Sequence, residues 1–117
     1  MRYIYFMSDQ PIYWISSSRE DLRHFPASAR RKAGLELRAL QRGEPPTDFK
    51  PMSSVGPGVM EIRINVGDAY RIFYVAKFTE GIYVLHAFQK KTQRTSKKDI
   101  QSGQQRYRAM LKERKSR

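Results

Sequence analysis

The sequence predicts an α+β fold in which two N-terminal helices pack on a small antiparallel sheet and a third helix follows the sheet. Three observations support this fold class. Apolar side chains recur at helical spacing across residues 26–43, three runs across residues 60–88 carry strand patterns, and residues 97–115 return to helical spacing. Strands and helices grouped in this way are typical of α+β folds. With 117 residues, the chain is expected to form one domain, 1–117.

Two apolar runs near the N-terminus, residues 3–7 and 12–15, are rich in aromatic and β-branched side chains. Either run could supply an N-terminal strand beside the main sheet. Ser17 and Glu20 have the spacing of a capping box, in which the hydroxyl and the carboxylate each accept a bond from a backbone N–H at the start of a helix. We therefore expect a short helix after Ser17, ending near Phe25.

The second helix is amphipathic. Pro26 suits its first turn, and Gly43 is a suitable C-terminal cap. The apolar stripe consists of Ala29, Ala33, Leu37 and Leu40. The outer face is basic, but Glu36 is mixed into it and the apolar stripe already explains the helix, so a solvated face is favoured over a binding site. The basic residues of this face are Arg30, Arg31, Lys32, Arg38 and Arg42.

Residues 43–58 contain four prolines and several glycines, which predicts a long, proline-stiffened loop without regular structure. Residues 60–66 then alternate as a strand with one face on the core and one face in water. After a turn at Gly67 and Asp68, residues 70–78 alternate in the same way, and residues 82–88 are nearly all apolar, as in a central strand. The result is a three-stranded antiparallel meander.

A C-terminal helix is expected over about residues 97–115, with Ser96 as its N-cap. Ile100, Tyr107 and Leu111 share its apolar face, and the remaining positions are mostly polar.

Charge is concentrated at the C-terminal end. The chain carries a net charge of +12, and residues 90–117 contribute +9 of it, from eleven Lys and Arg against two acidic residues. Such a field attracts polyanions, because neutralised phosphates release their counterions. RNA is therefore the expected partner. A solvated helix that only keeps the protein soluble is the alternative, and an anionic membrane surface is less favoured because the segment has few large apolar residues.

Composition also excludes several kinds of site. The chain has no cysteine, which rules out disulfides, thiolate zinc sites and cysteine nucleophiles. His24 and His86 are far apart in sequence and make a poor case for a metal centre, so we expect neither a metal nor another cofactor. The apolar run at residues 3–7 is too short for a signal peptide or a membrane span, and a cytoplasmic location is expected.

Polar groups with useful chemistry lie along the predicted meander. Neighbouring antiparallel strands would bring them together as a basic floor, on a sheet face with no helix over it. Such a floor suits an RNA backbone. Its members are Glu61 and Arg63 on the first strand, Arg71 on the second, and His86, Lys90 and Lys91 on the third.

Metal-independent RNA cleavage needs a base for the 2′-hydroxyl, cations around the phosphorus and an acid for the leaving oxygen. Glu61 or His86 could be the base, Arg63 and Arg71 could hold the phosphate, and His86 or a lysine could be the acid. The alternatives are a plain surface ion pair for Glu61 and Arg63, and a hydrogen-bonded core residue for His86.

Three segments resemble a known family. Gly-Val-Met-Glu-Ile-Arg at 58–63, Tyr-Arg-Ile-Phe-Tyr at 70–74 and Leu-His-Ala-Phe-Gln-Lys-Lys-Thr at 85–92 resemble the phage-derived branch of HigB toxins in the RelE/ParE superfamily. The last segment is the strongest motif. The resemblance runs from about the first helix through the last. It implies a RelE-like fold, a ribosome-dependent mRNA endonuclease, and a helix-turn-helix, HigA-like antitoxin as partner.

By position, the resemblance makes Arg71 a phosphate-holding arginine, Arg63 a strand cation and Lys91 a residue near the late catalytic cation. Glu61 stands where RelE has a lysine, which leaves the general base open. Members of the ParE type act on DNA gyrase, so a gyrase inhibitor, or a plain RNA-binding protein, remains the alternative function. The residues expected to contact RNA are Lys90, Lys91, Arg94, Lys97 and Lys98.

Overall fold

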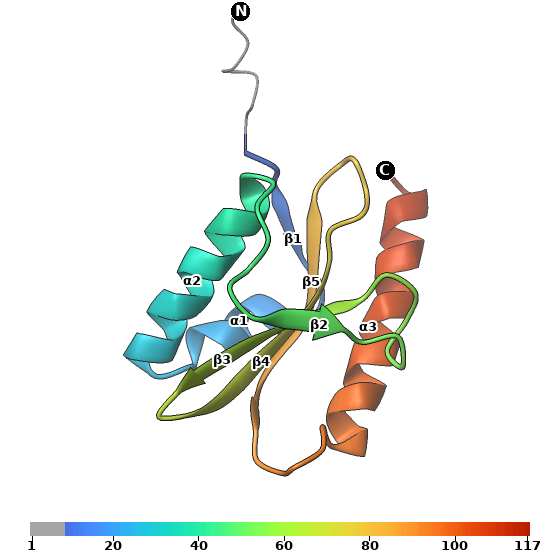
Figure 1. Cartoon of the computed structure of the whole chain (residues 1–117). Coiled ribbons are helices and arrows are strands. Elements are labelled where there is room, and N and C mark those ends of the chain that lie inside the picture. Colours follow the sequence, from blue (N-terminus) through green and yellow to red (C-terminus); the bar gives the residue numbers. More distant parts are fainter. Residues whose placement is uncertain (1–8) are drawn as a thin grey trace, which may run out of the picture.

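The structure, a computed structural model, describes residues 9–117 and is built on one five-stranded mixed sheet with helices on both faces (Figure 1). The strand order is β1-β5-β4-β3-β2. Of the two candidate N-terminal strands, residues 12–15 supply β1, whereas residues 3–7 lie outside the described residues. The elements are β1 (Ile12–Trp14), α1 (Ser18–Arg23), α2 (Ala27–Gln41), β2 (Phe49–Pro51), β3 (Met60–Val66), β4 (Asp68–Val75), β5 (Ile82–Lys90) and α3 (Lys97–Lys115).

The predicted meander is confirmed. β3 pairs with β4 and β4 with β5, both antiparallel. The turn between β3 and β4 is tight, since Val66 lies opposite Asp68 and Gly67 takes the left-handed conformation with φ 77°. β5 lies between β4 and β1, and its residues 82–88 are all buried.

Two features of the sheet differ from the expectation. The sheet is not wholly antiparallel, because β1 runs parallel to β5, with Ile12 opposite Ile82. The parallel arrangement is possible because the helices and β2 to β4 provide the crossover that it needs. In addition, β2 lies inside the segment expected to lack regular structure and pairs with β3. Pro51 is tolerated there because β2 is an edge strand.

α1 and α2 cover one face of the sheet, and the predicted apolar stripe of α2 is buried against it. Contrary to the expectation, Glu36 does not lie on the outer face of α2. It is buried, with 4% of its surface exposed. Its carboxylate accepts bonds from the backbone N–H and the hydroxyl of Thr47, both at 3.1 Å, and so ties α2 to the loop before β2.

α3 covers much of the other face, which corrects the expectation of a sheet face without a helix (Figure 1). Phe73, Leu85 and Phe88 of the sheet pack with Met110 of α3. Ile100 and Tyr107 are partly buried against this second core, as expected, but Leu111 is 38% exposed and Met110 takes the place expected for it. Met110 lies two turns after the buried Gly103 and therefore shares its face of the helix.

Of the two helix N-caps predicted at serines, one is confirmed and the other is wrong. Ser96 caps α3 as expected, since its hydroxyl oxygen accepts a bond from the Asp99 N–H at 3.1 Å. The capping box at Ser17 is wrong. The Ser17 hydroxyl donates to the Asp21 carboxylate at 2.8 Å and accepts a bond from Arg106 of α3 at 2.9 Å, so it links two helices instead of capping one.

Gly103 supplies a stability test of how α3 docks. A Cβ at this position would lie 2.9 Å from both the Phe73 ring and a Val55 methyl group. Overpacking costs about 1–3 kcal/mol, against about 1 kcal/mol gained when alanine replaces glycine in a helix. We expect Gly103→Ala to lower the free energy of unfolding in urea, whereas Gly34→Ala, where a Cβ meets nothing within 4 Å, should raise it. A stabilised Gly103→Ala variant would contradict this docking.

Candidate active site

Strand register brings the charged residues of the meander to one sheet face. Arg71 lies between Arg63 on β3 and Phe88 on β5, and Glu61 lies opposite Phe73. Lys90 lies opposite Ala69, two residues before Arg71, so it shares this face. The charged cluster is defined here as Lys50, Glu61, Arg63, Arg71 and Lys90. Sequence reasoning missed Lys50, which pairs with Glu61 through the unexpected strand β2.

A β-bulge in β5 is needed for this arrangement. Phe73 lies opposite His86, but the next residue, Tyr74, lies opposite Val84, so Leu85 is an extra residue in the ladder. Leu85 and Phe88 consequently pack in the same core. Without the extra residue, Lys90 would face α1 and α2, because a shift of one residue moves a side chain to the other side of a sheet.

Glu61 and Arg71 form the buried part of the cluster, with 1% and 7% of their surface exposed. The Arg71 Nε lies 3.9 Å from the Glu61 Oε1. Arg71 donates from Nη1 to the Asn65 amide oxygen at 3.2 Å and to the Tyr70 carbonyl at 2.9 Å. Within the described residues, Glu61 Oε2 and Arg71 Nε are buried without a hydrogen-bond partner. Such atoms are rare in folded proteins, and a catalytic role is one of their explanations.

Burial raises the pKa of Glu61, and the four cations of the cluster oppose this rise. Burial also lowers the pKa of Arg71, opposed mainly by Glu61. A carboxylate whose pKa lies above its usual range is a better proton acceptor than an ordinary surface glutamate. The cluster therefore combines a base with cations that can hold an anion.

The other predicted RNA contacts lie further out. Arg63 is partly exposed, and its Nε lies 3.2 Å from the Asp48 carboxylate. Lys90 and Lys91 line a small pocket of about 190 Å3 together with Ser96 and Asp99. Arg94 is exposed on the segment before α3, and Lys97 and Lys98 are exposed at the start of this helix.

His86 lies on the same sheet face as the cluster, separated from Glu61 by Phe73, and both of its ring nitrogens contact residues of α3. Its Nε2 lies 2.8 Å from the Asp99 carboxylate, and its Nδ1 lies 2.9 Å from an Arg106 nitrogen. Since a guanidinium can only donate, Nδ1 accepts, and the proton on Nε2 is donated to Asp99. Both ring nitrogens are thus used inside the protein. This geometry fits the alternative interpretation of a hydrogen-bonded core histidine.

His86 makes folding pH-dependent. Burial lowers its pKa most, Asp99 opposes this and Arg106 adds to it. Between this lowered pKa and about 6.5, the unfolded chain binds more protons than the folded protein. The free energy of unfolding should therefore decrease as pH falls below about 6.5, and urea unfolding at several pH values measures it. The decrease should shrink in His86→Gln and persist in His24→Gln, which changes an exposed histidine. An unchanged pH slope in His86→Gln would contradict this role.

Residues 9–117 contain neither a group of metal ligands nor a membrane-spanning helix. No three His, Asp or Glu side chains there are grouped so that they could hold a metal ion. No helix of this part of the chain is long and apolar enough to cross a membrane.

A model of the phage-derived Gp49-like proteins (DUF891) matches residues 20–108, which include the whole charged cluster. The chain belongs to this family. The Gp49-like family is a RelE-like toxin family, consistent with toxins of toxin-antitoxin pairs, so an antitoxin partner is implied in general terms. The mixed sheet with three helices is compatible with a RelE-like fold, although its strand count and arrangement differ in detail. No curated protein matches the sequence.

Proposed function

We propose that this Gp49-like protein is a HigB-type toxin that cuts mRNA on the ribosome, by attack of the RNA 2′-hydroxyl without a metal. The single observation that supports it best is the buried Glu61, with an unpartnered carboxylate oxygen, among four cations on one sheet face. A negatively charged phosphate fits this excess of positive charge, and a proton acceptor is already in place.

In the proposed reaction, the Glu61 carboxylate takes the proton of a 2′-hydroxyl. The resulting oxygen attacks the adjacent phosphorus, and the bond to the 5′-oxygen breaks. Arg71, through its unpartnered Nε, and Arg63 bind the phosphate oxygens as charge builds up in the transition state. Lys90 or Lys91 gives a proton to the leaving 5′-oxygen. The products are a 2′,3′-cyclic phosphate and a 5′-hydroxyl.

Substrate must displace side chains to reach the base, because Glu61 is only 1% exposed. The cations around it have long, rotatable stems, and Arg63 is held mainly by one exposed ion pair with Asp48. An exposed ion pair contributes at most about 1 kcal/mol, so a phosphate can replace Asp48 as the partner of Arg63. Binding of RNA then opens the way to Glu61.

In the proposal, the basic surface of α3 binds the ribosome. Its exposed cations lie on the far side from the second core, where ribosomal RNA phosphates can reach them. Binding of the protein to the ribosome should therefore weaken steeply as the salt concentration rises. The exposed cations of α3 are Lys97, Lys98, Arg108, Lys112 and Lys115. The cognate inhibitor in the proposal is a helix-turn-helix, HigA-like antitoxin.

Induction in bacteria, followed by mapping of mRNA 5′ ends, tests the activity. New 5′-hydroxyl ends should appear within codons and disappear when translation initiation is blocked. Arg63→Ala and Lys90→Ala should reduce their number about 10-fold or more, because each removes a phosphate-binding cation. Arg31→Ala removes an equal charge from the exposed surface of α2 and should have no such effect.

Growth arrest with intact mRNA would contradict the proposal. A DNA damage response in that case would favour a gyrase inhibitor. Salt-sensitive RNA binding without cleavage, on ribosomes or off them, would favour a plain RNA-binding protein.

A further inference from the structure

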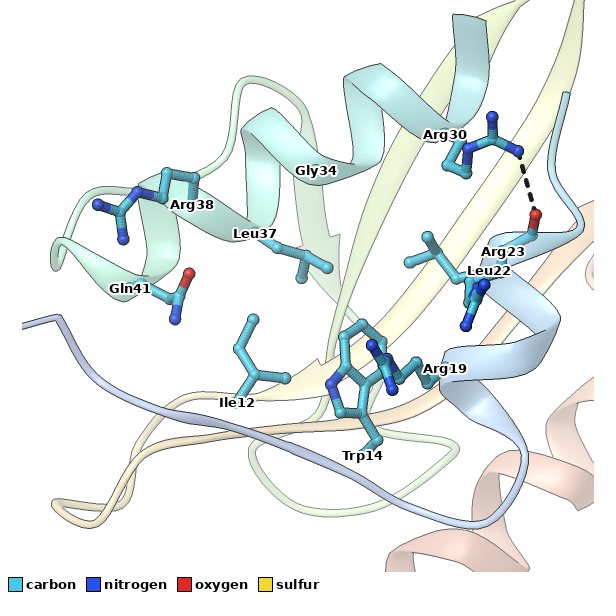
Figure 2. A pocket seen from close by; sticks show the side chains of 10 residues that line it. All are labelled: Ile12, Trp14, Arg19, Leu22, Arg23, Arg30, Gly34, Leu37, Arg38 and Gln41. Carbon is cyan, nitrogen blue, oxygen red and sulfur yellow. Dashed lines mark hydrogen bonds between the residues drawn. The ribbon is translucent and has the colours of Figure 1, made fainter. Parts of the chain in front are cut away.

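A pocket of about 400 Å3 lies between α1, α2 and β1 (Figure 2). Ile12, Trp14, Leu22 and Leu37 point into it and make an apolar floor. This groove lies on the α1/α2 side of the sheet, whereas the charged cluster lies on the α3 side. The rim carries four arginines, all exposed: Arg19, Arg23, Arg30 and Arg38.

Gly34 is an independent sign of an occupant. It lies in the middle of α2, where glycine is about 1 kcal/mol less favourable than alanine. Nothing in the protein requires it, because a Cβ there would meet no atom within 4 Å and its φ is not in the left-handed region. A glycine on a helix surface lets another backbone approach closely. Gly34 therefore marks the place where a partner segment would cross α2.

The residues around Gly34 indicate the chemistry of that segment. Arg30 and Arg38 lie one turn before and one turn after it, on the same face of α2. Leu35 beside it is the most exposed large apolar side chain of the described residues, at 68%. A close approach over the glycine would thus place aliphatic side chains in the groove and carboxylates between the arginines.

We propose that the groove binds an acidic amphipathic helix of a protein partner. Burial of aliphatic side chains against Ile12, Leu22 and Leu37 would supply affinity, and pairing with the arginine rim would supply orientation. RNA fits less well, because Ile12, Leu22 and Leu37 offer no hydrogen bonds to phosphates or bases and the arginines lie on the rim. The proposal rests on the proposed function only for the identity of the partner, which is then the antitoxin.

The sheet separates the groove from the proposed active site. A helix bound there would not touch Glu61 or Arg71, because the sheet lies between them. Groove variants should therefore keep the toxic activity but escape the partner. This behaviour separates the groove from the active site.

The probe is the protein encoded by the gene next to the gene for this chain, bound to the full-length protein in calorimetry. Gly34→Gln, which suits a helix but fills the groove, and Arg19→Glu with Arg38→Glu should each weaken binding about 30-fold or more. The matched control, Lys32→Glu in α2 with Arg42→Glu at its C-cap, changes the net charge equally but away from the groove, and should change binding less than 3-fold. Circular dichroism and melting temperature verify folding, and Gly34→Gln should melt no lower than the wild type.

Several outcomes would overturn the proposal: no binding of the neighbouring protein, equal binding by groove and control variants, or loss of RNA affinity in the groove variants with partner binding intact. A wild-type dimer that Gly34→Gln dissociates would assign the groove to a second copy instead. If the wild type cuts no RNA but the groove variants still lose the partner, the proposed function fails and the docking surface stands.

Discussion

Glu61→Gln is expected to reduce RNA cleavage about 10²–10⁴-fold, the usual contribution of a general base. Glutamine keeps the size of the side chain but cannot take the proton of the 2′-hydroxyl. The cations that bind phosphate remain, so RNA affinity should change little. Single-turnover cleavage of mRNA on translating ribosomes measures the loss, and a binding assay at matched salt verifies that RNA is still bound.

The pH dependence gives a second readout of the same residue. Because burial raises the pKa of Glu61, the fraction of ionised Glu61 increases with pH over a range above that of an ordinary glutamate. The wild-type cleavage rate should therefore rise through this range, and the rising limb should be absent in Glu61→Gln. Glu44→Gln, the same change on the exposed loop after α2, should keep both the rate and the limb. Full activity in Glu61→Gln would show that another group is the base.

Periodicity explains which elements could be predicted from the sequence. α2 buries a regular apolar stripe, β3 and β4 alternate, and β5 is a continuous apolar run bounded by polar residues, so the existence of these elements is visible in the pattern. β1 and β2 have three residues each, too few to show a period, and their pairing depends on partners far away in the chain. The parallel pairing of β1 with β5 therefore had no local signal.

The charged cluster was predictable in part, because cross-strand neighbours follow from the meander itself. Arg63 and Arg71 lie directly opposite each other, as two adjacent strands of that register require. The bulge at Leu85 was not predictable. In a continuous apolar run, an extra residue does not alter any visible alternation of apolar and polar residues. Lys50 was missed because it depends on β2.

The expectation of an open sheet face failed because the apolar face of α3 is weak in sequence. Gly103 and Met110 are the buried residues of α3, and a glycine adds nothing to a hydrophobic pattern. The packing of α3 fixes His86 in a hydrogen-bonded network with Asp99 and Arg106. On the same sheet face, Glu61 and Arg71 are buried, where their charges are costly.

Arg71→Met is expected to lower the free energy of unfolding by about 3 kcal/mol, since it leaves the Glu61 carboxylate buried without its nearest cation. Adding Glu61→Leu to Arg71→Met should restore most of this loss. Replacing a buried ion pair with apolar side chains of similar volume is often neutral or stabilising. Urea unfolding of the wild type, both single variants and the double variant gives the coupling free energy of the pair.

The pH dependence separates this explanation from a simple packing defect. In Arg71→Met, protonation of Glu61 removes the buried charge, so the loss of stability should become smaller as pH falls through the raised pKa of Glu61. A loss that is equal at all pH values, or a double variant as unstable as Arg71→Met, would mean that Arg71 acts through packing alone. A stable but inactive double variant would instead show that the buried pair serves cleavage at the expense of stability.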